Sequence, residues 1–250
     1  MRLLKACTIN ELAKLTARKK TLFFLLLSAL LPFIGLPIVR QLQNGLGVVG
    51  VAQDQYAISV LNGLTLFLIP LTIFMLASDT FSGEFGDRSI RSVLTRPVGR
   101  GKIFAAKLLA LFAIVAGQLL LSLAASSLAS LFLPSSGSAL NGLGTAALAY
   151  AAAALPMLTL CAAAALVAQG FKNASGALAV CILLYAAAKL VGFVFPSYMA
   201  YAPTSYTDWY TLWIGSSVSV GKLVNVFNFL LGCGIVFYAL GYTIFDRKEG

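Results

Sequence analysis

The chain has 250 residues, of which 60% are hydrophobic and 10% are charged, and its mean hydropathy is +0.91. A soluble domain carries about 25% charged residues, so this composition excludes a water-soluble globular protein and predicts an integral membrane protein. The sequence contains no histidine, which excludes Ser-His and Cys-His catalysis and zinc sites with imidazole ligands. The net charge of +10 comes from bases at the ends of apolar runs, a distribution that favours contact with anionic lipid over nucleic acid.

The first 20 residues predict a helix on the membrane surface that leads like an elbow into the first span. Two stripes at helical spacing mark it, one largely apolar and one charged. A disordered tail is the alternative, because Ile9 falls outside both stripes. No A-x-A-like cleavage site follows the first apolar run, so we expect a signal anchor rather than a removed leader. The apolar stripe consists of Leu4, Thr8, Leu12 and Leu15, and the charged stripe of Glu11, Lys14 and Arg18.

Six apolar segments are long enough to cross a bilayer, since about 20 helical residues span roughly 30 Å of hydrocarbon. The third segment is longer than needed and predicts a tilted helix. Pro70 and Pro156 fall inside the second and fourth segments and predict local kinks. We find no internal repeat or linker and expect residues 1–250 to form one all-α membrane domain. The segments are approximately 21–39, 56–78, 104–133, 145–168, 174–196 and 223–245.

Lysine and arginine gather on one side of the predicted spans. Residues 1–20 and 79–107 carry six bases each, and Lys172 and the C-terminus add three. The other side has Arg40 and Lys222. By the positive-inside rule, both termini and the segment between spans two and three are cytoplasmic, which predicts a multi-pass membrane protein with this orientation.

The four cysteines are far apart and form no C-x-x-C pair, so we expect neither a disulfide framework nor a metal site. Three of them lie inside apolar runs, where a small buried thiol is the expected role. They are Cys7, Cys161, Cys181 and Cys233.

The cytoplasmic segment 79–102 carries three acids and five bases between two long apolar runs. Asp87 is placed to cap a short helix that runs from about Arg88 to Thr95. Pro97 stops this helix, because the residue before a proline disfavours the helical conformation.

The predicted short helix has one apolar face, formed by Ile90, Val93 and Leu94 at helical spacing. Arginines, including Arg91, surround this face. An apolar surface rimmed by arginine suits insertion into a groove on another protein. The alternative is that the face folds back onto the membrane, with the bases on lipid phosphates. The residues alone leave both open.

The spacing of residues 79–107 resembles the cytoplasmic loop of ABC-2 type transporter permeases, E-x-x-x-G-T-L-x-x-L-L-x-x-P-x-x-R-x-x-x-x-x-x-K. The Gly-Thr-Leu of that pattern is loosened here to Asp-Arg-Ser-Ile at 87–90, and the outer stretch between spans five and six is short. The general layout of a basic N-terminal helix followed by six spans is also similar. The residues that carry the pattern are Asp79, Glu84, Gly86, Ile90, Leu94, Pro97, Arg100 and Lys107.

The resemblance implies that this loop is a coupling helix, which docks on a separate ATP-binding subunit. Glu84 would help to hold the loop in shape at that contact, although local pairing of Asp79 and Glu84 with Arg88 or Arg91 is the simpler interpretation. The residues expected at the ATPase contact are Glu84, Asp87, Arg88, Ile90, Arg91, Val93, Leu94, Pro97 and Arg100.

The chain has no Walker A loop of its own. The two Gly-Lys pairs are followed by Ile103 and Leu223 instead of Ser or Thr. We therefore expect no cofactor and no enzyme activity in this chain, with ATP and Mg²⁺ on the partner subunit. Six spans make a thin wall for a pathway, so a second permease copy, identical or related, is expected.

The outer half of the molecule offers few candidates for a pathway. Lys189 is the one charge deep in an apolar run and either snorkels to the outer headgroups or faces a cavity. Asn62 and Gln118 are polar residues within spans, where interhelical hydrogen bonds are the default and pathway lining is the alternative. The aromatic-rich stretch 197–222 predicts a belt at the headgroup level, or a lid over a pathway.

Together with these observations, the resemblance implies the permease subunit of an ATP-driven exporter in the cell (plasma) membrane. Two alternatives remain at this point. A secondary transporter or channel usually carries several ionisable residues at mid-membrane, and here only Lys189 qualifies. A non-transporting anchor or sensor subunit of a larger complex is compatible with the composition.

Overall fold

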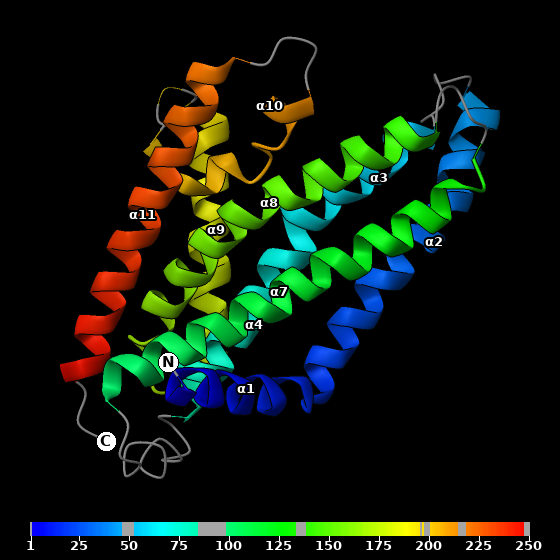
Figure 1. The fold of residues 1–250 in the computed structure, drawn as a ribbon. Helices are drawn as coiled ribbons and strands as arrows, with labels where there is room; N and C mark the ends of the chain where they lie inside the picture. The colour runs from blue at the N-terminus through cyan, green and yellow to red at the C-terminus, as the bar shows by residue number, and fades with distance from the viewer. Residues whose placement is uncertain are drawn as a thin grey trace.

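The computed structural model describes residues 2–46, 53–84, 99–133, 139–195, 197, 201–214 and 219–247, and every regular element in these ranges is a helix (Figure 1). The fold is therefore all-α, as predicted. The elements are α1 (Arg2–Thr16), α2 (Lys19–Leu46), α3 (Gln53–Gly63), η1 (Leu64–Leu68), α4 (Ile69–Ala77), η2 (Ser78–Gly83), α7 (Arg100–Ser130), α8 (Ala139–Ala168), α9 (Ala174–Val194), η4 (Pro203–Tyr206), α10 (Thr211–Ile214) and α11 (Val220–Arg247).

Six helices in the described chain are long and apolar enough to cross a membrane, which confirms the six predicted spans. The third, α7, has 31 residues and crosses the molecule obliquely in Figure 1, as its excess length predicts. The spans run over Lys19–Gln41, Gln55–Gly83, Arg100–Ser130, Gly142–Ala168, Ala174–Val194 and Val220–Arg247.

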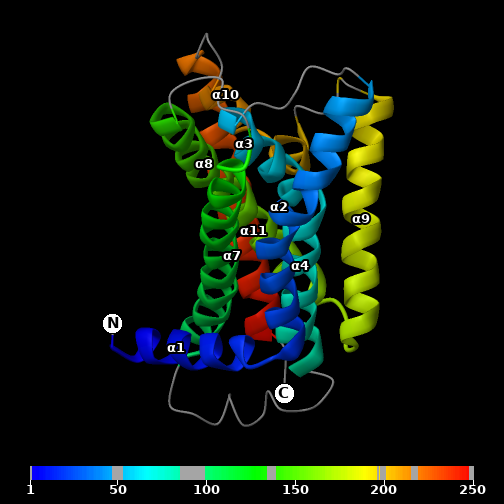
Figure 2. The same ribbon diagram turned by 90° about the vertical axis from the view of Figure 1, so that its right-hand side faces the viewer.

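The N-terminal helix α1 lies across one end of the bundle, at a steep angle to the spans (Figure 2). It ends at Thr16, and α2 begins at Lys19, so the 1–20 segment is a helix followed by a tight turn. Leu15 is buried in the core and Leu12 packs against it, whereas Leu3 and Ile9 are exposed. The apolar stripe of α1 thus faces the protein at its C-terminal end.

The second span is a composite of α3, η1, α4 and η2, of which η1 and η2 are π-helical. Pro70 lies at the start of α4, directly after the π-helical turn Leu64–Leu68. A proline has no N–H for the carbonyl four residues earlier, so the carbonyl of Leu66 loses its helical donor. The hydroxyl of Tyr185 on α9 donates to this oxygen at 3.0 Å and ties the two helices together.

The carbonyl that Pro156 leaves without a donor in α8 is also satisfied by a side chain. Pro156 frees the carbonyl of Ala152, and the indole nitrogen Nε1 of Trp209 donates to that oxygen at 2.6 Å. Pro70 and Pro156 therefore each free a backbone carbonyl that accepts a hydrogen bond from an aromatic side chain of another segment.

The Trp209 bond corrects one expectation for the outer stretch. Trp209 and Tyr210 are buried within the protein, so they do not belong to a belt of headgroup-facing aromatics, whereas Tyr201 and Trp213 are exposed. Trp209 is recruited inward because the oxygen freed by Pro156 needs a donor at membrane depth.

The core lies between α3, α4, α7 and α8, where most of the fully buried side chains gather. The outer helices contribute much less: α9 buries three residues of its span, and α11 buries Leu230, Gly241 and Phe245. Large apolar side chains on α2, α9 and α11 remain exposed. These faces meet lipid or another protein.

Candidate functional site

Four charged side chains, three of them buried, form an ionic cluster where α1 crosses the end of the bundle. The ammonium of Lys107, with a side-chain exposure of 0%, lies 2.5 Å from Glu84 Oε2 and 3.2 Å from Glu11 Oε2. Lys14 donates to the other oxygen of Glu84. Two acids and two bases balance one another, which is the condition for burying charge in an apolar protein.

The cluster joins three separate parts of the chain. Glu11 and Lys14 are three residues apart on α1, so they share one face of that helix. Lys107 comes from α7, and Glu84 follows η2 at the start of the charged segment. The N-terminal helix, the charged segment and the third span are therefore fastened at one point.

Glu84 remains a carboxylate at neutral pH. Its burial works to raise its pKa, but the charge of Lys107 and hydrogen bonds from Lys107 and Lys14 outweigh this effect and hold the pKa below the usual glutamate value. The contacts are therefore charge-assisted and stronger than those of a neutral pair.

A second set of ion pairs is formed by Asp79, which precedes Glu84 in the chain. Asp79 Oδ2 is 3.2 Å from Arg18 Nη1 and 3.5 Å from Lys20 Nζ. Asp79 belongs to η2, Arg18 lies in the turn between α1 and α2, and Lys20 lies in the first turn of α2. Both ends of the π-helical segment η2 are thus tied to the N-terminal region of the chain.

These pairs differ from the local contacts expected from sequence. In the described part of the chain, the ion-pair partners of Asp79 and Glu84 come from the N-terminal region and from α7. Arg88 and Arg91 lie outside the described residues. The charged stripe Glu11, Lys14 and Arg18 was the signal for this arrangement, because all three of its members form these pairs.

Of the residues expected at the ATPase contact, the structure describes the two that bracket the segment. Glu84 belongs to the cluster, and Arg100 begins α7 and donates to the backbone carbonyl of Asp246 at the end of α11. The intervening short helix stays a prediction. The expected contact residues outside the described ranges are Asp87, Arg88, Ile90, Arg91, Val93, Leu94 and Pro97.

The three candidate pathway residues have different surroundings. Gln118 is fully buried, and its Nε2 donates to Thr72 Oγ1 at 3.3 Å, the default interhelical bond. Asn62 is exposed on α3. Lys189 donates to Thr207 Oγ1 at 2.8 Å, so it ties α9 to the outer segment that follows it.

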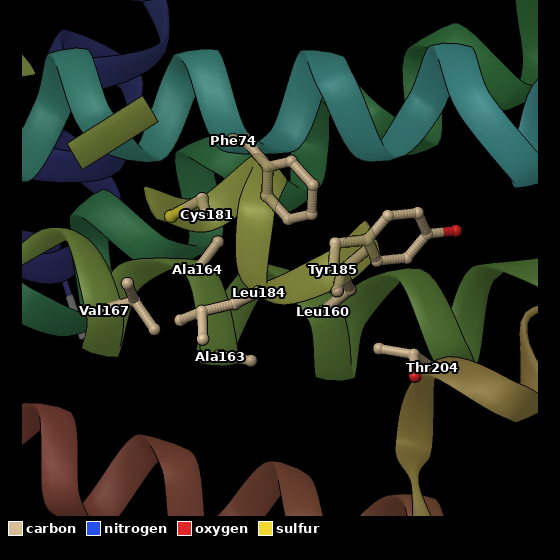
Figure 3. Close-up of a pocket in the computed structure, with 9 residues that line it drawn as sticks. All are labelled: Phe74, Leu160, Ala163, Ala164, Val167, Cys181, Leu184, Tyr185 and Thr204. Atoms are coloured by element: carbon tan, nitrogen blue, oxygen red, sulfur yellow. The ribbon is translucent and has the colours of Figure 1, made fainter. Parts of the chain in front are cut away.

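A small cavity of about 110 Å³ lies between α4, α8 and α9 (Figure 3). Its wall is almost wholly apolar, and Cys181 lines it as a buried thiol. The rings of Phe74 and Tyr185 meet edge to face with centroids 5.5 Å apart. None of the three candidate pathway residues lines this cavity, so we interpret it as imperfect packing between helices.

The family model described as ABC-2 family transporter protein matches residues 11–249, almost the whole chain. The chain belongs to the ABC-2 transporter family. No curated protein matches the sequence significantly. Membership makes this chain an ABC transporter permease, a multi-pass membrane subunit whose family works with an ATP-binding partner. The ionic cluster of this permease contains Glu84 and Lys107, an acid and a base that both belong to the loop pattern of residues 79–107.

Proposed function

We propose that this permease forms the membrane path of an ATP-driven exporter, as a pair of permeases. Each binds an ATP-binding subunit through the part of the charged segment 79–102 that runs from Glu84 to Arg100. The observation that carries the proposal is the ion pair between Glu84, at the start of that segment, and the fully buried Lys107 of α7. Through this ion pair, a force that acts on the segment would be transmitted directly to the membrane span α7.

Transmission of force needs rigid contacts on both sides of the moving segment. On its N-terminal side, Glu84 is held by Lys14 of α1 and Lys107 of α7. On its C-terminal side, Arg100 is anchored to the end of α11. A movement of the segment would therefore be shared by α1, α7 and α11 rather than absorbed in a loose loop.

The π-helical turns of the second span suit a part that changes shape. A π-helix is less common than an α-helix and often marks a functional site, because its extra residue can be redistributed along the helix. The segment η2 ends immediately before Glu84, and η1 lies midway along the same span. In our proposal, a change in η2 accompanies the switch between inward-open and outward-open states.

The arrangement of charge supports a cytoplasmic position for this end of the bundle. Helix α1, the start of α7 and the end of α11 lie together there (Figure 1). Together with Arg18, Lys19 and Lys20 at the turn into α2, they carry most of the lysine and arginine residues of the described chain. By the positive-inside rule, this charge supports a cytoplasmic position for both termini and for the proposed ATPase contact.

A second permease copy would complete the path. Helices α2, α9 and α11 expose large apolar side chains along their length, among them Phe23, Leu183 and Ile235. In the part of the chain that the structure describes, the core of the six-helix bundle is closely packed without a wide internal passage, so in our proposal the path runs between two copies. The second copy in this proposal is either an identical chain or a related permease.

The proposal is tested by purifying the tagged full-length chain from its native membrane in mild detergent and identifying the proteins that accompany it by mass spectrometry. We expect a near-stoichiometric partner with a Walker A loop. Absence of any ATPase, under conditions in which other membrane complexes stay intact, would contradict the proposal and favour a secondary transporter or an anchor subunit.

A further inference from the structure

A second, larger cavity of about 370 Å³ lies between α7, α8 and α11. Its wall includes Ala105 and Leu109 of α7, Thr159 of α8, and Gly234 and Tyr238 of α11. These three helices come together at the end of the bundle that carries α1 (Figure 1). The cavity therefore lies in the half of the membrane next to α1.

The interior of this cavity offers almost no hydrogen bonds. The hydroxyl of Thr159 is engaged with the carbonyls of Leu155 and Leu230, both at 3.2 Å. The rest of the wall is hydrocarbon, apart from the phenol of Tyr238. At the rim, Leu109 is 46% exposed and Ile235 67% exposed, so the cavity opens sideways toward the bilayer. The occupant that suits such a wall is an acyl chain.

The helices close the cavity at its end nearer the membrane surface. A Cβ atom on Gly241 would lie 2.9 Å from Cζ of Phe104, and one on Gly101 would lie 3.2 Å from Cε2 of Tyr242. Such contacts show that α7 and α11 touch closely just beyond the cavity, because glycine permits the approach. An acyl chain would therefore enter the cavity from the side that faces the lipid.

A basic side chain lies at this closed end. Lys102 is exposed and shares one face of α7 with Ala105 and Leu109, at positions i, i+3 and i+7. It lies about 4.5 Å nearer the membrane surface than Ala105, by the rise of an α-helix. Within the described ranges, no carboxylate forms an ion pair with Lys102. Lys107 projects from the opposite side of α7, into the ionic cluster.

We infer that the cavity binds one anionic phospholipid of the leaflet on the α1 side, with an acyl chain between α7, α8 and α11 and its phosphate on Lys102. Lys102 lies on the membrane-surface side of the cavity wall, which is the side where the phosphate of a phospholipid lies relative to its acyl chain. This lipid site does not depend on the ATPase contact. The identification of the leaflet on the α1 side as the inner, cytoplasmic leaflet rests on the orientation in the proposed function. The lipid would fasten α11 to α7 and α8, at the end of the bundle where the charged segment begins and ends.

The test is native mass spectrometry of the purified full-length permease, titrated with phosphatidylglycerol or with phosphatidylcholine of the same acyl chains. We expect one phosphatidylglycerol to be retained per chain in preference to phosphatidylcholine. Gly234→Leu should reduce retention of both lipids at least tenfold, because a Cβ at Gly234 meets only Thr159 Oγ1, at 3.8 Å, and a longer side chain extends into the cavity. Lys102→Gln should lower the preference for the anionic lipid about fivefold, the effect of one base near an anionic headgroup.

Gly232→Leu is the matched control, because the site lies on the same helix, has no atom within 4 Å of a Cβ and does not line the cavity. It should bind lipid like the original chain. Equal binding by Gly234→Leu and the original chain would overturn the inference, as would equal loss in both glycine variants. Lys102→Gln tests the headgroup separately, at an exposed position where folding is not at stake; an unchanged lipid preference would also overturn the inference.

Discussion

Lys107→Met should destabilise the permease by about 3–5 kcal/mol, the usual cost of leaving buried charges without their partner. The change removes the base that lies between Glu11 and Glu84 and leaves two nearly buried carboxylates with the single, half-exposed base Lys14. Methionine keeps the length of the side chain, so lost packing contributes little. The measurement is the free energy of unfolding in one detergent, from denaturant titrations of both proteins.

Two further variants separate charge from general damage to α7. Lys102→Met makes the same substitution five residues earlier, at an exposed position without an ion pair among the described carboxylates, and should change stability by less than about 0.5 kcal/mol. The triple change Glu11→Gln, Glu84→Gln and Lys107→Met removes the unpaired charges and should recover much of the lost stability. Equal effects of Lys107→Met and Lys102→Met would contradict the role assigned to the cluster.

Ile90→Asp should weaken binding of the ATP-binding subunit by at least about thirtyfold, as the loss of a central apolar contact does in protein interfaces. On the helix predicted for residues 88–95, Ile90 lies at the centre of the apolar face, and a carboxylate there would have to be desolvated in the partner's groove. The measurement is the affinity of the purified ATPase for the permease in detergent, together with ATP-dependent transport in vesicles once a substrate is known.

Ser92→Asp is the control for this change, because it adds the same charge two residues later, on the opposite face of the predicted helix. It should bind the ATPase nearly as well as the original chain. If Ile90→Asp bound equally well, the apolar face would have another role, such as contact with the membrane surface.

The sequence predicted the number of spans and their approximate limits, because a bilayer imposes a length and a composition on each helix. It also identified Pro70 and Pro156 as interruptions, but not their remedy. The hydroxyl of Tyr185 and the indole of Trp209 satisfy carbonyls on distant helices, and such pairings depend on how helices pack. For the same reason, Trp209 was predicted at the headgroups and is buried instead.

The sequence identified the residues of the ionic cluster but not their pairing with one another. Glu84 and Lys107 were identified as members of the spacing pattern over 79–107, and Glu11 and Lys14 as members of a charged stripe on the predicted N-terminal helix. Helical periodicity identifies residues that share a face, but it does not say what that face meets. A charged stripe on a surface helix normally faces water, and only the tertiary structure shows that this one faces Glu84 and Lys107.

The central claim is that the segment between Glu84 and Arg100 contacts an ATP-binding subunit, and a photo-crosslinking amino acid at Val93 tests it most directly. The crosslinker is activated in intact cells, and the adduct is identified by mass spectrometry; Leu120, an exposed residue of α7 at mid-membrane, is the control position. We predict that the crosslinker at Val93 forms a covalent adduct with a protein that carries a Walker A loop, and that the crosslinker at Leu120 forms no such adduct. Adducts from Val93 with lipid alone would contradict the account and place the charged segment on the membrane surface.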